Sequence, residues 1–311
     1  MNRIPLLWVL LFSFVTRDLS AISADDLCPI CNKKYGPKIY ALSKHGRDER
    51  VLVCGDCAKL DTTCYICGIP VKEKFMRLAD GRLLCDEDAK QAVLTQEDAN
   101  NIFEEVKADA QSLLARLGSL PDRNIHLALE AKARLDKTGN NIISAHDDRL
   151  LMGLTRTTAS DAEHFEHTIY LLYGLTRERM MVVAAHEYGH TWLHENVRRK
   201  LNNDTVEGFC DWIAFNVIKG KNAPYETKLL LESLYSQGQL QSFILAENEH
   251  SFYKVIQWVK SGIDPEIDPE HLEGVLKLRN QPTAPFELFA GAPVFPRATP
   301  TNLVLKGLSG S

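Results

Sequence analysis

The sequence has no excess of positive charge and, beyond its first residues, no apolar run long enough to cross a bilayer. Its net charge at pH 7 is -5 over 311 residues, so nothing draws it electrostatically to the phosphates of nucleic acid. A transmembrane helix needs about 20 consecutive apolar residues, and no internal stretch approaches that. We therefore expect no nucleic-acid partner and no internal membrane-spanning helix. The apolar share of 45% and the charged share of 25% are typical of a globular protein.

The N-terminal residues have the layout of a secretory signal peptide. The positively charged Arg3 precedes the apolar residues 4–15, and small residues follow as far as Ala24. We therefore expect residues 1–24 to be removed and the rest to be exported, into a periplasm or out of the cell. No stable membrane insertion is expected after cleavage. The alternative is that the segment stays as an N-terminal membrane anchor.

Eight cysteines would suggest disulfides in an exported protein, but their spacing favours zinc. C-x-x-C pairs begin at Cys28, Cys54 and Cys64, and Cys85 is followed at the same spacing by Asp88. Each pair forms a short turn that aims two ligands at one point, as tetrahedral zinc requires. A disulfide within such a turn would be strained. We expect two structural zinc sites whose four positions are all filled by protein.

The order of the pairs resembles a LIM domain, whose two zinc ions are held by consecutive sets of four ligands. The resemblance implies a first zinc on Cys28, Cys31, Cys54 and Cys57, and a second on Cys64, Cys67, Cys85 and Asp88. It also implies that residues 25–92 form a module for docking a protein partner or substrate. Two features depart from the pattern: Cys54 stands where LIM domains usually have His, and the spacer after Cys57 is longer than usual.

The stretch His186-Glu187-Tyr188-Gly189-His190 has the pattern H-E-x-x-H and lies in an apolar run without proline. Residues four apart project from one face of a helix. Both imidazoles can then bind one Zn²⁺ while Glu187 reaches a water on the metal. The pattern predicts a catalytic zinc helix with Glu187 as general base. The alternative is a surface helix that carries two histidines by chance.

A carboxylate in the next helix is the expected third ligand. Glu207 lies far enough beyond His190 for a loop and an antiparallel helix, and it would complete a His₂Glu site with one open position. Asp211 lies one turn further on the same face, where it can accept the spare N–H of a ligating histidine and fix its tautomer. The alternatives are a capping box started by Asp204, with Glu207 as its acidic partner, and an exposed carboxylate at Asp211.

Other residues near the motif receive lesser roles. His194 is a rival third ligand, but a straight helix separates it from His186 by about 12 Å, too far for both to share one ion. Cys210 is expected to be a small buried residue beside the site. His250 and Tyr253 are candidates for stabilising the oxyanion of a peptidase transition state, with ordinary packing as the alternative.

H-E-x-x-H followed by the E-x-x-x-D of Glu207 and Asp211 resembles the gluzincin pattern. With a LIM-like module ahead of it and E-G-x-C at 207–210, the chain is similar to the plant LIM-containing metallopeptidases that limit organ growth. Bacterial chains share this architecture. The resemblance covers roughly residues 28–260 and implies a zinc-dependent endopeptidase. The plant enzymes are activated by ubiquitin, but no ubiquitin-interacting helix is recognisable here, so only the peptidase chemistry is carried over.

We therefore expect an α+β fold with a two-zinc LIM-like finger module and a mainly helical zincin-type (gluzincin) metallopeptidase domain with a small sheet. The domain is expected over residues 93–280 and a Pro-rich tail over 281–311. Thr95 should cap the first helix, which should end at Gly118. Strands are expected over 150–156 and 167–173, the second of which should offer a free edge to an extended peptide substrate.

The sequence thus predicts a zinc endopeptidase with one catalytic and two structural Zn²⁺ ions. The alternative is a non-catalytic zinc-binding protein that serves as an interaction scaffold. The presence of Glu187 argues against that alternative, because a structural zinc site needs no base.

Overall fold

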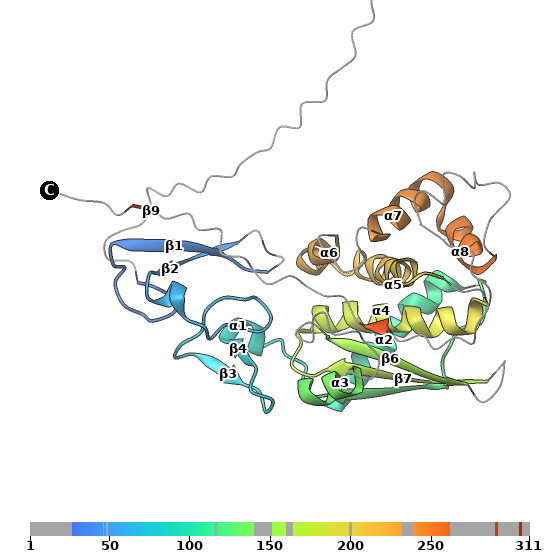
Figure 1. Ribbon diagram of the computed structural model, residues 1–311, viewed down its shortest axis with the longest axis horizontal. Helices are drawn as coiled ribbons and strands as arrows, with labels where there is room; N and C mark the ends of the chain where they lie inside the picture. Colours follow the sequence, from blue (N-terminus) through green and yellow to red (C-terminus); the bar gives the residue numbers. More distant parts are fainter. Residues whose placement is uncertain are drawn as a thin grey trace, which may run out of the picture.

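The computed structural model describes residues 27–115 (apart from 46 and 48), 117–139, 151–159, 164–198, 201–231, 239–261, 290–291 and 305–306. The expected signal peptide and most of the expected tail lie outside these ranges. Within them, small hairpins form the N-terminal part, and helices around one sheet form the rest (Figure 1). The secondary structure is therefore a mixture of helices and small sheets, as the sequence predicts.

Two hairpins form the N-terminal part. Strands β1 (Lys38–Ser43) and β2 (Arg50–Cys54) pair antiparallel, and β9 (Leu305–Lys306) pairs with the outer edge of β1. The second hairpin joins β3 (Phe75–Arg77) to β4 (Leu83–Cys85). The short helices η2 (Cys57–Lys59) and α1 (Asp86–Ala89) follow β2 and β4, respectively. Each short helix thus carries one predicted zinc ligand, Cys57 or Asp88, at the end of a hairpin.

The sheet of the second part has the order β5-β7-β6-β8. Its strands are β5 (Ile125–Glu130), β6 (Gly153–Ala159), β7 (Phe165–Leu172) and β8 (Ala290–Gly291). Strand β7 is parallel to β5 and antiparallel to β6, while β8 is antiparallel to β6. The expectation that the strand before the catalytic helix has a free edge is therefore wrong, because β7 is paired on both sides. Helix α3 (Lys132–Gly139) follows β5, and this crossover brings β5 and β7 together in a way that no local pattern reveals.

Helix α4 (Arg177–Asn196) lies at the centre of this part, between the sheet and α5 (Asn203–Ile218). Residues 179–193 are all buried, which accords with a helix that is apolar around its circumference. The other helices are α2 (Gln96–Leu114), α6 (Pro224–Leu231), α7 (Gln239–His250) and α8 (Phe252–Ser261). No helix in the described ranges combines the length and apolarity needed to cross a membrane.

The first helix of this part begins as the sequence predicts. The Thr95 side chain accepts a hydrogen bond from the Asp98 backbone N–H at 3.1 Å, so the N-cap is confirmed. The helix ends at Leu114 rather than at Gly118, and Ala115 is already outside the helical conformation, with ψ 134°. The chain thus leaves the helix earlier than predicted. Leu117, the last apolar residue of the predicted helix, is nevertheless buried in the core.

The two fingers belong to different parts of the hydrophobic core. The buried residues of the second finger, such as Ile69 and Leu84, join one continuous cluster with the helices and the sheet. The first finger has a separate buried cluster of its four cysteines and Val53. The second finger is therefore packed as part of the larger unit.

The tip of the second hairpin docks against the end of β7. The Arg82 guanidinium lies over the rings of Tyr65 and Tyr173, at 4.7 and 5.1 Å from their centroids, and donates to the Tyr173 carbonyl at 2.6 Å. Gly174 has φ +77°, and a Cβ there would lie 2.5 Å from Leu78, so a residue without a side chain is needed. These contacts fix the chain just before it enters α4.

We predict that Arg82→Ala lowers the free energy of unfolding of the helical part by about 2–4 kcal/mol, because it removes a charged hydrogen bond and two cation–π contacts. Urea unfolding followed by tryptophan fluorescence measures this, since Trp192, Trp212 and Trp258 are all buried there. The control is Arg77→Ala, an exposed residue of the same hairpin. Equal losses in the two variants would contradict a docking role for Arg82.

Candidate metal centres

The close approach of α4 and α5 brings the candidate catalytic residues together. A Cβ on Gly189 would lie 3.1 Å from both the Cα and the Sγ of Cys210, so the small residue inside H-E-x-x-H lets the second helix come near. Helix α5 begins with Asn202 as N-cap, whose side chain accepts from the Thr205 N–H at 2.7 Å. The alternative capping box started by Asp204 is therefore wrong. Glu207 lies one turn into the helix and is free for another role.

Three side-chain atoms converge between the two helices. His186 Nε2 lies 3.1 Å from His190 Nε2 and 3.2 Å from Glu207 Oε2, and His190 Nε2 lies 3.9 Å from that oxygen. Ligands about 2.0–2.1 Å from a tetrahedral Zn²⁺ are about 3.3 Å from one another. The three atoms therefore have the spacing of three ligands around one ion.

The chemistry of this cluster fits a cation. The two Nε2 atoms and Glu207 Oε2 are all buried, and apart from one another they have no other hydrogen-bond partner among the described residues. Burial alone would lower the pKa of His186, but hydrogen bonds and charges from Asp211 and Glu207 raise it well above its usual value. The pKa of His190 is lowered by burial and by His186. A positive charge is thus favoured where the three atoms meet, and a divalent metal would supply it.

The other nitrogen of each histidine is held by α5. Asp211 Oδ1 lies 2.8 Å from His186 Nδ1, and both side chains are fully buried. Cys210 Sγ lies 3.3 Å from His190 Nδ1. Each contact leaves the Nε2 atom facing Glu207. Asp211 is thus placed where the sequence predicts it, whereas the contact between Cys210 and His190 was not foreseen.

Cys210 could itself be a ligand, because its sulfur, His186 and His190 offer atoms within 4.8 Å of one another. The sulfur, however, lies on the Nδ1 side of His190, while the two Nε2 atoms face each other and Glu207. Burial, followed by nearby carboxylates, raises the pKa of Cys210 well above its usual value. The thiol form of Cys210 is therefore favoured. A thiol can be a hydrogen-bond partner of His190 Nδ1, whereas a metal ligand must be a thiolate.

Glu187 lies beside this cluster and is held by the sheet. Thr155 on β6 donates to Glu187 Oε2 at 2.7 Å, whereas Glu187 Oε1 has no hydrogen-bond partner in the described part of the chain. Burial raises the pKa of Glu187 to about 8, against the opposing effects of the His186 charge and the Thr155 hydrogen bond. A nearby dication would favour the carboxylate form. The side chain is therefore placed to exchange a proton.

The structure also brings together both predicted sets of finger ligands, Cys28, Cys31, Cys54 and Cys57 in one and Cys64, Cys67, Cys85 and Asp88 in the other. The sulfurs of Cys31 and Cys54 are 3.8 Å apart, as are those of Cys67 and Cys85. This is about the separation expected for two thiolates on one tetrahedral zinc. Either group could hold a metal ion.

Backbone and side-chain contacts hold the candidate ligands of both fingers in place. Burial would raise the pKa of Cys28, but backbone N–H donors such as that of Cys54 lower it to about 7. In the second group, Asp88 Oδ2 lies 3.1 Å from the Cys64 sulfur, while Arg47 approaches Oδ1 at 3.5 Å. Arg47 also lies over the Tyr225 ring of α6 at 5.1 Å. Arg47, in the turn between β1 and β2 of the first finger, thus contacts both the second finger and the helical part.

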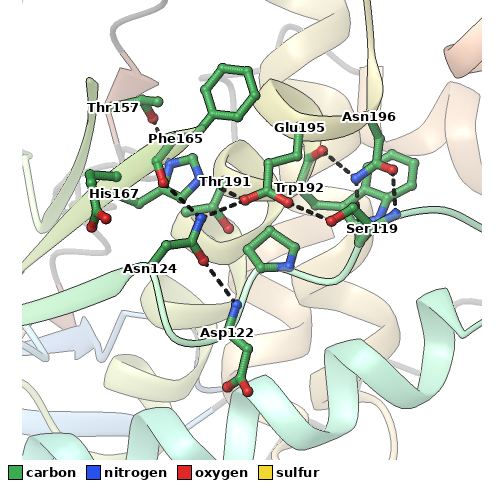
Figure 2. A network of polar contacts seen from close by, with 12 residues as sticks. Ser119, Asp122, Asn124, Thr157, Phe165, His167, Thr191, Trp192, Glu195 and Asn196 are labelled. Carbon is green, nitrogen blue, oxygen red and sulfur yellow. Dashed lines mark hydrogen bonds and ion pairs between the residues drawn. The ribbon is translucent and has the colours of Figure 1, made fainter. Parts of the chain in front are cut away.

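A polar network at the C-terminal end of α4 holds the helix to the sheet (Figure 2). The Glu195 carboxylate accepts from Asn124 Nδ2 and Ser119 Oγ, both at 2.7 Å. His167 on β7 lies 3.2 Å from Glu195 and 2.8 Å from the Thr157 hydroxyl. Burial would raise the pKa of Glu195, but these donors lower it below its usual range. The network fixes the far end of the helix, as the finger contacts fix its beginning.

The remaining candidates are placed elsewhere. His194 lies near His167, with ring centroids 6.2 Å apart, rather than among the three converging atoms. His250 ends α7 and contacts its neighbour Glu249 at 3.6 Å, and Tyr253 on α8 is 58% exposed. No described contact brings His250 or Tyr253 to Glu187 or to the histidine cluster. Their placement thus gives no support to an oxyanion role.

Three comparisons relate the chain to known proteins. The family model described as "DA1-like: Protein DA1" matches residues 133–271. Protein DA1-related 6 of Arabidopsis thaliana is 25% identical over 181 residues, which cover 50% of this chain and 27% of that protein. LIM domain-containing protein HDR3 of Oryza sativa subsp. japonica is 22% identical over 213 residues, or 61% of this chain and 40% of that protein.

The chain thus spans well under half the length of these relatives. No solved structure gives a significant match. The region matched by the family model contains His186, Glu187, His190, Glu207 and Asp211. The candidate catalytic centre therefore lies entirely within the part of the chain that is similar to the DA1-like family.

Proposed function

We propose that this protein is a zinc-dependent endopeptidase, with Zn²⁺ held by His186, His190 and Glu207. The observation that carries the proposal is the convergence of two Nε2 atoms and one carboxylate oxygen at 3.1–3.9 Å, with a further carboxylate, Glu187, beside them. The similarity to DA1-like proteins supports it. The substrate would be a protein or peptide.

Zn²⁺ in this site would lower the pKa of a bound water and polarise the carbonyl of the scissile peptide. Glu187 accepts a proton from the attacking water as its oxygen bonds to the carbonyl carbon. It then delivers the proton to the leaving nitrogen as the C–N bond breaks. Asp211 and Cys210 hold the two imidazoles so that their Nε2 atoms stay aimed at the metal.

We propose structural roles for the other two metals, on the two finger groups. The finger module would dock the substrate or a protein partner. A cavity of about 760 Å³ between the fingers supports this, because its lining combines apolar residues such as Ile30 and Ile69 with the charged Lys72, Glu73 and Lys74. We propose that the chain is exported, on the strength of residues 1–24.

Glu187→Gln should lower kcat by at least about 100-fold while leaving zinc content unchanged, because the amide cannot accept the proton of the water. Cleavage of casein and of a peptide library measures activity, with metal analysis of the same samples. Glu178→Gln, on the first turn of the same helix, is the control and should behave as wild type. Equal activity in wild type and Glu187→Gln would overturn the catalytic role. If neither cleaves any substrate, the non-catalytic scaffold is supported.

The purified chain should contain about three zinc ions, one for each group of ligands. His186→Ala should contain about two, since the finger sites fill independently. Elemental analysis after exhaustive dialysis measures the content. One zinc or none in the wild type would contradict the assignment.

Asp211→Asn should weaken zinc binding at the catalytic site about 10- to 100-fold, because the amide cannot replace the carboxylate that holds His186 Nδ1–H. Competition with a chelator measures the affinity. Asp204→Asn, near the start of the same helix, removes the same charge and should leave the affinity within about twofold. The prediction fails if the two variants bind zinc equally well.

A further inference from the structure

Strand β6 presents its alternate residues Gly153 and Thr155 to α4 at the turn that carries Glu187. The Thr155 side chain is 1% exposed, and its hydroxyl lies 2.7 Å from Glu187 Oε2 and 3.1 Å from the Glu187 carbonyl oxygen. A hydroxyl has one proton to donate. The carboxylate oxygen is closer than the carbonyl oxygen and is the stronger acceptor. Thr155 therefore donates to Oε2.

Gly153 makes room for the same carboxylate. A Cβ at this position would lie 2.8 Å from Glu187 Oε1 and 2.5 Å from Val183 Cγ1. The strand thus passes so close to α4 that any side chain here would push Glu187 out of place. The register of β6 on β7, where Thr155 is opposite Ile169, holds both residues in position.

The two oxygens of Glu187 consequently have different surroundings. Oε2 is bonded to Thr155, whereas Oε1 is buried and accepts no hydrogen bond from the described residues. A carboxylate that turns freely about its last bond would exchange these oxygens. The Thr155 hydroxyl opposes such a turn, because it would break a buried, charge-assisted hydrogen bond. After a half-turn the same bond forms again, so one oxygen is always held by Thr155 and the other is left without a partner.

We propose that Thr155 is a positioning residue that orients the general base, so that Oε1 alone takes the proton of the attacking water. This role rests on the proposed peptidase function. Oε1 receives the proton as the water oxygen bonds to the carbonyl carbon, and it returns the proton to the leaving nitrogen when the C–N bond breaks. Oε2 stays bonded to Thr155 throughout.

The test compares Thr155→Val, which keeps the shape and loses the hydroxyl, with Thr155→Ser, which keeps the hydroxyl. The matched control is Thr157→Val, on the same face of β6, whose hydroxyl contacts His167 instead of Glu187. For each protein, kcat, KM, zinc content and melting temperature are measured. The Kd of a peptide hydroxamate is also measured, because this probe binds zinc and donates a hydrogen bond to the general base.

Thr155→Val should lower kcat about 10- to 100-fold, from loss of one hydrogen bond to a charged group. Its KM should change less than threefold and its zinc content should stay at the wild-type value. Thr155→Ser should recover most of the loss in kcat. The hydroxamate should bind Thr155→Val at least about fivefold more weakly than wild type. Thr157→Val should keep wild-type kcat and hydroxamate affinity even if its melting temperature falls.

Any of three results would overturn the role of Thr155. Thr155→Val could keep kcat within twofold of wild type, Thr155→Ser could restore none of the lost kcat, or kcat could fall in proportion to the zinc content. A wild-type chain that cleaves nothing overturns the proposed function, and hydroxamate affinity then decides whether Thr155 orients Glu187. A wild-type chain that neither cleaves nor binds the hydroxamate overturns both. The outcomes therefore separate failure of the peptidase from failure of this residue.

Discussion

The buried hydrogen bond between His186 Nδ1 and Asp211 Oδ1 sets the register of the two central helices. Both side chains are fully buried, and a charged group in such surroundings is strongly destabilising unless a partner neutralises it. Sliding α5 along α4 by even one residue would separate the pair. The same register places Glu207, one turn earlier on α5, opposite the Nε2 atoms, and places Cys210 against Gly189. One polar contact in an apolar interface thus determines the geometry of the candidate centre.

Helix α4 is also fixed at both ends by polar contacts of a different kind. At its beginning, Gly174 and Leu175 exchange backbone hydrogen bonds with Val93, at 2.7 and 2.8 Å. At its end, Glu195 binds the segment after α2 and the strand β7. The middle of the helix therefore has little freedom to tilt or to turn about its axis. A metal site whose ligands lie on two helices needs such rigidity, because a shift of about 1 Å spoils coordination and catalysis alike.

Much of the candidate site follows from local spacing, and the rest depends on tertiary contacts. The positions of His186, His190, Glu207 and Asp211 are predictable because helical periodicity and the length of a helical hairpin relate them. The finger ligands are predictable because C-x-x-C fixes a turn. Thr155 has no such signature: it approaches Glu187 only because β6 crosses α4 there, and one threonine in a strand resembles any other. The internal position of β7 was mispredicted for the same reason, since strand order depends on a crossover.

The two fingers belong to separate buried clusters, and this affects how the chain unfolds. The second finger shares its apolar core with the helices and sheet, so it can unfold only together with them. The first finger has a core of four cysteines and Val53, so a metal bound by those cysteines would supply much of its stability. Its unfolding would therefore depend on a bound metal more than that of the second finger would, even though Lys44 and Arg47 contact Glu87 and Asp88. The division between the two buried clusters falls between Cys57 and Cys64, inside what the sequence predicts to be one module.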